Sequence, residues 1–498
     1  MNTAVMYAKA IITTLISLVS VPLILKALGH SDYGIYQLIG GVIAMLSFLN
    51  ASMTVSTQRF MSVSLGENNN REFNLIYNVG FTLHLLIAVF ILVLLESFEP
   101  LVFSGFLNVE PDRIIAAKVV FQILIISTVF TIISVPFNAV LNAKENLTVF
   151  AIIHIIDSML KLLLAVVLVY SPIDRLIFYS IGMGLIAAFA FLMKLLYVRF
   201  RYKYLVLSPL KTFDKNLFIK MFGFAGWNTM GSMALVGRNQ GISVLLNIFY
   251  GTIINAAYGV ADQVNSLMNY LSQTLQQAIN PQLMRSEGMK DRDRMMRISY
   301  ISCKFSVLII CLPAIPLILE MQYVFKLWLH DIPQYAVILT QLVLTLTIIT
   351  QYSSGLQAAI QSVGKVRSYY ITVSFLILLN VPISYYLLKA GLPPYYTVVC
   401  FIGIEVITLV TRLLFVKKYV GIGIAKYLRL VMLPTIVTIL IASAPAYLIQ
   451  QFMHESFFRL IIVCTSYAIS YMILAWLLAL DEQTKLYILS VTRKLLKK

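Results

Sequence analysis

The sequence has few charged residues and no long polar stretch. Asp, Glu, Lys and Arg make up only 12% of its 498 residues, about half of the share that is usual in soluble proteins. The longest polar stretch runs only from about Arg199 to Lys220, which is too short for a sizeable soluble domain. We therefore expect the protein to act inside a bilayer, with polar residues of its membrane spans as its tools.

Motifs for soluble catalysis and metal binding are also missing. The sequence has no phosphate-binding loop of an ATPase, no zinc-ligand spacing and no nucleophile elbow. We therefore expect a transporter and not an enzyme, with no catalytic residue, no metal site and no cofactor. Coupling of transport to H⁺ or Na⁺ stays open. The four cysteines fall inside hydrophobic segments and are interpreted as free thiols; they are Cys303, Cys311, Cys400 and Cys464.

What the sequence does contain is a series of about fourteen hydrophobic segments with little between them. Each is about 20 residues long, and a helix of this length crosses the ~30 Å hydrocarbon core of a membrane. We expect helices because an open sheet in lipid would leave backbone groups without hydrogen bonds. The predicted fold class is an all-α integral membrane protein with about fourteen transmembrane helices.

The positive charges predict the orientation of the chain. The net charge is +17, but the charges lie in short loops beside the spans, where they act as topology signals and contact anionic lipids, not nucleic acid. With a cytoplasmic N-terminus, 28 of the 38 Lys and Arg residues are cytoplasmic, 7 are on the opposite side and 3 are within spans. We therefore predict that both termini are cytoplasmic.

The chain contains an internal repeat with an offset of about 221–226 residues. Tyr33-Gly34 opens one long span and Tyr258-Gly259 opens another. Six spans separate the two copies, so both copies have the same orientation, which predicts two six-helix lobes in a parallel pseudo-two-fold repeat. The predicted lobes are 1–205 and 206–425, followed by two extra helices and a cytoplasmic tail in 426–498.

Charged residues inside the spans are candidates for substrate binding. A charge at the centre of a span costs roughly 2.5–3.5 kcal/mol on insertion scales. Arg238, followed by Asn239 and Gln240, lies near the middle of the seventh span and cannot deprotonate. We interpret it as a cavity cation for phosphate or an acidic sugar; the alternative is a structural pair with a carboxylate. Arg59 and Lys9 near span ends bind a headgroup or extend to the interface, and both alternatives stay open.

The eighth predicted span has a polar stripe that cannot face lipid. Asp262, Asn265, Asn269 and Gln273 share one face of the helix at helical spacing. Amide side chains have both donors and acceptors and therefore suit sugar hydroxyls. The alternative function of the stripe is polar contact between packed helices.

Ion coupling has three candidate residues. Asp157 and Lys161 are four residues apart and share a helix face. They form either a self-neutralised pair or a proton or sodium site. Asp262 on the eighth span is the third candidate.

Four segments resemble those of a known family: Leu28–Tyr36, Thr57–Phe60, Phe224–Asn228 and Asn280–Gln282. They look like segments of bacterial polysaccharide exporters of the Wzx type, which flip O-antigen and capsule units. These exporters belong to the multidrug/oligosaccharidyl-lipid/polysaccharide flippase superfamily. The resemblance covers essentially the whole chain and implies two six-helix bundles, with helices one, two, seven and eight lining the cavity.

The function that we predict is flipping of undecaprenyl-diphosphate-linked oligosaccharide across a bacterial inner membrane by alternating access. Expected partners are this lipid-linked oligosaccharide, membrane lipids, and a polymerase with other glycan-assembly proteins. Three alternatives stay open: a MATE-like drug/cation antiporter, a flippase for the peptidoglycan precursor, and, from another class, a membrane-embedded glycan polymerase or ligase.

Overall fold

The computed structural model confirms an all-α protein. It describes residues 2–44, 47–101, 103, 110–171, 174–208, 212–329, 332–482 and 485, and no β-strand occurs among them. The predicted tail at 486–498 lies outside the described residues. The chain divides into two compact units: unit 1 is Met1–Ser232 with Asn280–Lys290, and unit 2 is Met233–Ile279 with Asp291–Lys498. The lobe boundaries at 205 and 425 stay predictions.

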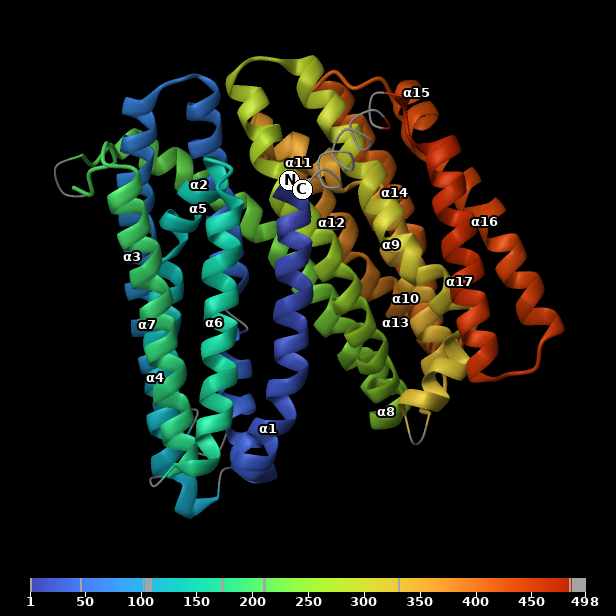
Figure 1. The fold of residues 1–498 in the computed structure, drawn as a ribbon, viewed down its shortest axis with the longest axis horizontal. Helices are drawn as coiled ribbons and strands as arrows, with labels where there is room; N and C mark the ends of the chain where they lie inside the picture. Colours follow the sequence, from blue (N-terminus) through green and yellow to red (C-terminus); the bar gives the residue numbers. More distant parts are fainter. Residues whose placement is uncertain are drawn as a thin grey trace, which may run out of the picture. The chain divides into compact units, whose positions relative to one another are not determined.

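Unit 1 is a bundle in which α1 packs along α6 and α4 packs along α7 (Figure 1). Its apolar core includes Ile39, Phe121 and Leu168, which are fully buried. The helices of unit 1 are α1 (Asn2–Ala44), α2 (Ser47–Gly66), α3 (Asn70–Leu101), α4 (Ile114–Ile133), α5 (Val135–Ala143), α6 (Leu147–Val167), α7 (Arg175–Arg201) and the two ends of α8 (Lys215–Gly288).

Unit 2 contains the middle of α8 and the remaining helices. In it α9 packs against α10 and α11, and α16 packs along α17 (Figure 1). Arg459 of α17 donates to Glu320 of α9 at 2.7 Å, and this buried pair ties α17 to α9. The helices are α9 (Arg292–Trp328), α10 (Ala336–Gln351), α11 (Ser354–Val363), α12 (Arg367–Leu378), α13 (Asn380–Lys389), α14 (Tyr396–Tyr419), α15 (Ile424–Tyr427), α16 (Leu433–Phe452) and α17 (Phe457–Leu474).

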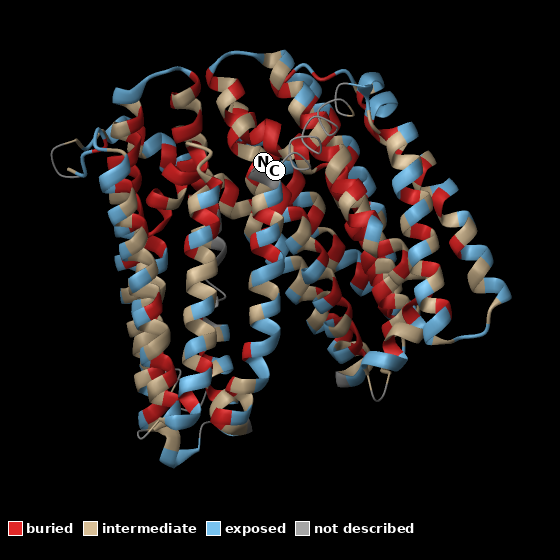
Figure 2. Cartoon of the chain, viewed as in Figure 1, coloured by how far each residue is buried: buried red, intermediate tan, exposed pale blue. Residues whose placement is uncertain are grey.

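The surfaces of the helices show that the chain is a multi-pass membrane protein. Exposed positions recur along α1, α6, α16 and α17 (Figure 2), and they include large apolar side chains such as Leu15, Leu163 and Leu440. Apolar surface of this extent is expected to face lipid and not water. Within the described ranges, ten helices are long and apolar enough to cross a membrane, or eleven if α10 and α11 form one bent span.

Among the described helices, three segments are long enough to cross a membrane but are not apolar enough. They are α2 and the two arms of α8, which meet at Gly251. The polar stripe expected in the eighth span lies on the second arm of α8. Polarity therefore separates these three helical segments from the lipid-facing helices, which is the pattern expected of helices that line water or substrate.

The internal repeat is visible in the backbone. Gly29 in α1 has φ 79° and Gly251 in α8 has φ 77°, and both values lie in a region that glycine adopts without strain. Asn68 and Lys290 share φ values of 55° and 56°. The two pairs have the same offset of 222 residues (251 − 29 and 290 − 68), within the predicted range. The two copies therefore bend and end their long helices at equivalent positions.

Equivalent glycines also contact each other inside unit 1. A Cβ on Gly66 would lie 2.2 Å from the backbone oxygen of Arg285, and a Cβ on Gly288 would lie 2.0 Å from the backbone oxygen of Val63. Gly66 and Gly288 are again 222 residues apart (288 − 66). The ends of α2 and α8 therefore pack backbone against backbone, and such a close approach requires residues without side chains.

Three segments of unit 1 meet at one arginine. Arg113 donates to Asp32 at 2.8 Å through Nε and to Asp174 at 2.6 Å through Nη1. Asp174 also caps α7 by accepting from the backbone N–H of Ile177. Burial alone would raise the pKa of Asp174, but the hydrogen bonds from Arg113 and Ile177 outweigh it and lower that pKa below its ordinary value.

We predict that Gly288→Ala destabilises the protein because the added methyl group collides with rigid backbone. Overpacking of this kind costs about 1–3 kcal/mol. Gly223→Ala is the matched control, since a Cβ at Gly223 of the same helix meets no atom within 4 Å. Thermal unfolding of the purified proteins in detergent tests this prediction, and equal midpoints for the two variants would contradict it.

We predict that Asp174 stabilises the protein in a pH-dependent way. A carboxylate with a lowered pKa contributes stability above its ordinary pKa of about 3.9, and this contribution is lost as the pH falls through the lower folded-state value. Asp174→Asn should therefore lower the unfolding midpoint at pH 7, and the difference from wild type should shrink toward about pH 3. A difference that is constant over this range would show that the charge is irrelevant.

Candidate functional site

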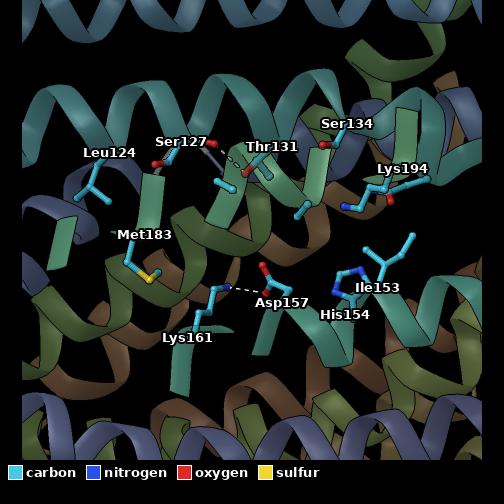
Figure 3. A pocket seen from close by; sticks show the side chains of 13 residues that line it. Leu124, Ser127, Thr131, Ser134, Ile153, His154, Asp157, Lys161, Met183 and Lys194 are labelled. Atoms are coloured by element: carbon cyan, nitrogen blue, oxygen red, sulfur yellow. Dashed lines mark hydrogen bonds and ion pairs between the residues drawn. The ribbon is translucent and has the colours of Figure 1, made fainter. Parts of the chain in front are cut away.

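Unit 1 contains a polar cavity of about 380 Å³ between α4, α5, α6 and α7 (Figure 3). Three hydroxyl side chains line one wall, and each donates to the backbone carbonyl four residues earlier: Ser127 to Ile123, Thr131 to Ser127 and Ser134 to Phe130. The other lining residues are Leu124, Asn138, Ile153, His154, Asp157, Lys161, Met183, Ala187, Ala190 and Lys194.

The cavity combines two lysines with one carboxylate. Lys161 and Asp157, both on α6, form an ion pair of 2.8 Å, as their spacing predicts. Lys194 of α7 is buried, and its amine points toward the cavity in Figure 3. The His154 ring packs on Phe150, with 4.4 Å between the ring centroids. The lining therefore carries more positive than negative charge.

Lys9 joins this group from α1. It is buried, and its ammonium lies 5.8 Å from the centroid of the Phe150 ring, a distance that permits a cation–π interaction. Lys9 also lies close enough to His154 to interact with it electrostatically. The structure thus brings Lys9 into one region with Asp157 and Lys161, although the sequence assigned Lys9 to substrate binding and the other two to ion coupling.

Arg59 lies in a different part of unit 1, toward the Gly66–Gly288 contact. Its guanidinium lies 4.8 Å from the ring centroid of Phe60 and 5.1 Å from that of Phe224. Glu67 and Glu287 are near enough to interact with it electrostatically. These neighbours fit an arginine that stabilises the packing of α2 on α8, and its role in substrate binding stays a prediction.

Arg238 lies half-buried on the first arm of α8, within unit 2. Its Nε and Nη2 donate to the side-chain oxygen of Asn239 at 3.0 and 2.9 Å, and its guanidinium lies 4.7 Å from the ring centroid of Phe401. Arg238 makes no ion pair with any residue that the structure describes. Glu405 and Asp262 are near enough to interact with it electrostatically, so the structural pairing with a carboxylate, the alternative left open by the sequence, stays open.

The polar stripe on the second arm of α8 forms a chain of hydrogen bonds. Asn269 donates to Asn265 at 2.9 Å, and Asn265 donates to Asp262 at 3.5 Å. Thr347 of α10 also donates to Asn265, at 2.7 Å. Helix packing thus uses part of the stripe. Gln273 is exposed and free of this chain, and so is Gln240 on the first arm.

The sequence did not identify two residues of these regions. Arg412 of α14 pairs with Glu405 at 2.6 Å and also donates to Ser353 and Tyr369, all buried in unit 2. The sequence placed Arg412 among the basic residues at the end of a span. Lys194 was assigned to the basic cytoplasmic cluster in the same way. The position of Lys194 could have shown that it lies inside the span and not at its end. It precedes the end of α7 at Arg201 by seven residues, which is about two helical turns.

Metal binding finds no support in the part of the chain that the structure describes, where no three His, Cys, Asp or Glu side chains are grouped to hold an ion. The four cysteines are free thiols, as interpreted from the sequence.

Comparison with known proteins identifies the fold. The family model MatE matches residues 6–167, about a third of the chain. A solved outward-facing structure of a multidrug resistance MATE family transporter of the MOP superfamily matches with a TM-score of 0.75 and 12% identity, over 84% of this chain and 94% of that chain. The chain has the fold of the MATE transporters.

Two further solved structures have the same likeness. A crystal structure of MATE in the straight conformation has a TM-score of 0.72 and 13% identity over 84% of this chain and 94% of that chain. A MOP superfamily transporter from Pyrococcus furiosus, whose binding pocket is described as having reverse polarity, has a TM-score of 0.73 and 12% identity over the same shares. A search of curated proteins finds no match. These comparisons establish the MATE fold and leave the Wzx-type branch a proposal.

We predict that the buried Glu405–Arg412 pair is required for the stability of unit 2. Glu405→Gln removes one partner and leaves a buried guanidinium without its countercharge, which should cost about 3–5 kcal/mol. The matched control is Glu455→Gln, which removes the same charge from the exposed pair with Lys326 and should cost under about 1 kcal/mol. Unfolding in detergent provides the measurement, and a similar loss in both variants would contradict the prediction.

Proposed function

We propose that this protein is an alternating-access membrane transporter that flips undecaprenyl-diphosphate-linked oligosaccharide across a bacterial inner membrane. The observation that carries the proposal is the environment of Arg238. This permanently charged side chain lies within a span, is half-buried, and has a neutral amide and an aromatic ring as its neighbours but no paired carboxylate among the described residues. An arginine in this state suits a ligand that brings its own negative charge, such as a diphosphate.

The second arm of α8 supplies groups for the glycan. Gln273 is exposed, and Asn269 and Asn265 keep part of their hydrogen-bonding capacity, because each amide has two donor hydrogens and two acceptor lone pairs. In the proposal these amides contact sugar hydroxyls while the prenyl tail stays in lipid. Arg59 and Lys9 would add positive charge along the route of the headgroup.

A drug/cation antiporter is the second candidate, and the fold comparisons favour it. A multidrug resistance transporter has the same fold, and Asp262 is a carboxylate on a polar span whose hydrogen bond from Asn265 is long, at 3.5 Å. Such an antiporter needs a carboxylate that exchanges a cation for protons or sodium. Asp262 is the residue that would do so, whereas Asp157 is already paired with Lys161.

The experiment that separates the two candidates measures the leaflet in which the lipid-linked oligosaccharide resides. In a deletion strain we expect loaded carrier to be trapped on the cytoplasmic face. Wild-type protein should release it, and Arg238→Ala should reduce release at least about tenfold, which corresponds to a lost interaction of about 1.4 kcal/mol. Arg201→Ala, which removes an exposed arginine at the end of α7, is the matched control.

Amounts of membrane-inserted protein must be equal for this comparison. Normal translocation in the Arg238→Ala strain would refute the role of Arg238. Normal translocation in the deletion strain, together with loss of drug efflux that Asp262→Asn reproduces, would instead establish the antiporter.

A further inference from the structure

The cavity of unit 1 contains a buried ammonium group that forms no direct ion pair with any described residue. The side chain of Lys194 is only 8% exposed, and no hydrogen bond or ion pair joins it to any residue that the structure describes. Burying an unpaired charge is costly, so a buried ammonium normally has an anionic partner. Figure 3 shows its amine directed into the cavity from the α7 side.

The one carboxylate that lines the cavity cannot balance every lysine nearby. Asp157 is near enough to Lys194 to act on it electrostatically, but its ion pair of 2.8 Å is with Lys161, so one carboxylate faces two lysines. Lys194 is therefore a second positive charge beside a pair that is already balanced. Lys9 of α1 adds a third, because it is close enough to act electrostatically on His154 of the cavity wall. The local field favours an anion over a cation.

Further polar groups face the same space without a described partner. Nε2 of His154 is buried and unpaired, and so is the side-chain oxygen of Asn138. The ring nitrogen is a donor in one of the two neutral tautomers of histidine, and the amide of Asn138 presents its NH₂ group when it is flipped. The three wall hydroxyls already donate to backbone carbonyls, so the donors for a ligand are Lys194, His154 and Asn138.

We propose that this cavity is an anion-binding site in which Lys194, aided by His154 and Asn138, holds a phosphate or carboxylate group. A volume of about 380 Å³ leaves room for more than a monatomic ion. The ligand is inorganic phosphate or the acidic group of a small molecule such as a sugar phosphate or a uronate. The site lies wholly within unit 1 and is independent of the proposed role of Arg238, so it stands if the flippase proposal fails.

Thermal unfolding of the purified full-length protein tests the site. Sodium phosphate replaces sodium chloride at constant ionic strength, in an uncharged detergent. A ligand at about tenfold excess over its Kd should raise the wild-type midpoint by about 1–3 °C. Lys194→Gln should abolish this rise, Lys194→Arg should retain part of it, and Lys203→Gln, which removes an exposed lysine on the loop after α7, should leave it unchanged.

Direct binding of radiolabelled phosphate gives a second measurement that does not depend on the glutamine variant being folded. Wild type and Lys203→Gln should bind with the same Kd, and Lys194→Arg should bind at least about threefold more weakly, because a guanidinium replaces a compact ammonium. Glucose 1-phosphate or glucuronate that displaces the label at about tenfold lower concentration than unlabelled phosphate would identify the acidic group of a sugar as the ligand. Displacement only at equal or higher concentration would identify free phosphate.

Two results would overturn the proposal. No phosphate dependence in the wild type, together with an unfolding midpoint that Lys194→Gln raises, would mean that Lys194 is only a costly buried group. Equal phosphate effects in wild type and Lys194→Gln would place the anion elsewhere on the protein.

Discussion

The constraint on which the rest of the structure depends is that a charge within a span needs a partner. Three buried or half-buried carboxylates satisfy it with cations of their own unit: Asp157 with Lys161, Glu320 with Arg459, and Glu405 with Arg412. The second of these pairs ties α17 to α9. Because so many charges are matched, the exceptions are informative. Arg238 in unit 2 and Lys194 in unit 1 are cations that form no direct ion pair with a described carboxylate, and both proposals rest on them.

A second constraint acts on the backbone. In a membrane, long helices approach closely only where side chains are absent, and they bend where glycine permits an unusual φ. The repeat places glycine at equivalent positions for both purposes, with Gly29 and Gly251 at the bends and Gly66 and Gly288 at the contact between α2 and α8. Duplication of one helical pattern thus explains both where the long helices bend and where their ends pack.

The fold and the charged side chains of this chain support different substrates, and the fold alone therefore does not assign the substrate. The fold is shared with MATE transporters at 12–13% identity, and at that level the side chains that select a ligand are free to differ. In this chain the cations without a described carboxylate partner favour an anionic ligand, whereas a cation antiporter depends on carboxylates. The substrate proposal therefore rests on Arg238 and its neighbours and not on the fold.

The sequence by itself determined the all-α membrane class, the repeat and the polar stripe on the second arm of α8. These features follow from local hydrophobicity, glycine positions and the bilayer's demand for internal hydrogen bonds. The Asp157–Lys161 pair was also predictable, since residues four apart on a helix are neighbours. Only the tertiary structure decided that Glu405 pairs with Arg412, that Arg59 lies between two phenylalanines, and that Lys194 is buried beside a cavity. These facts depend on which faces of distant helices pack together, and hydropathy along one segment does not contain that information.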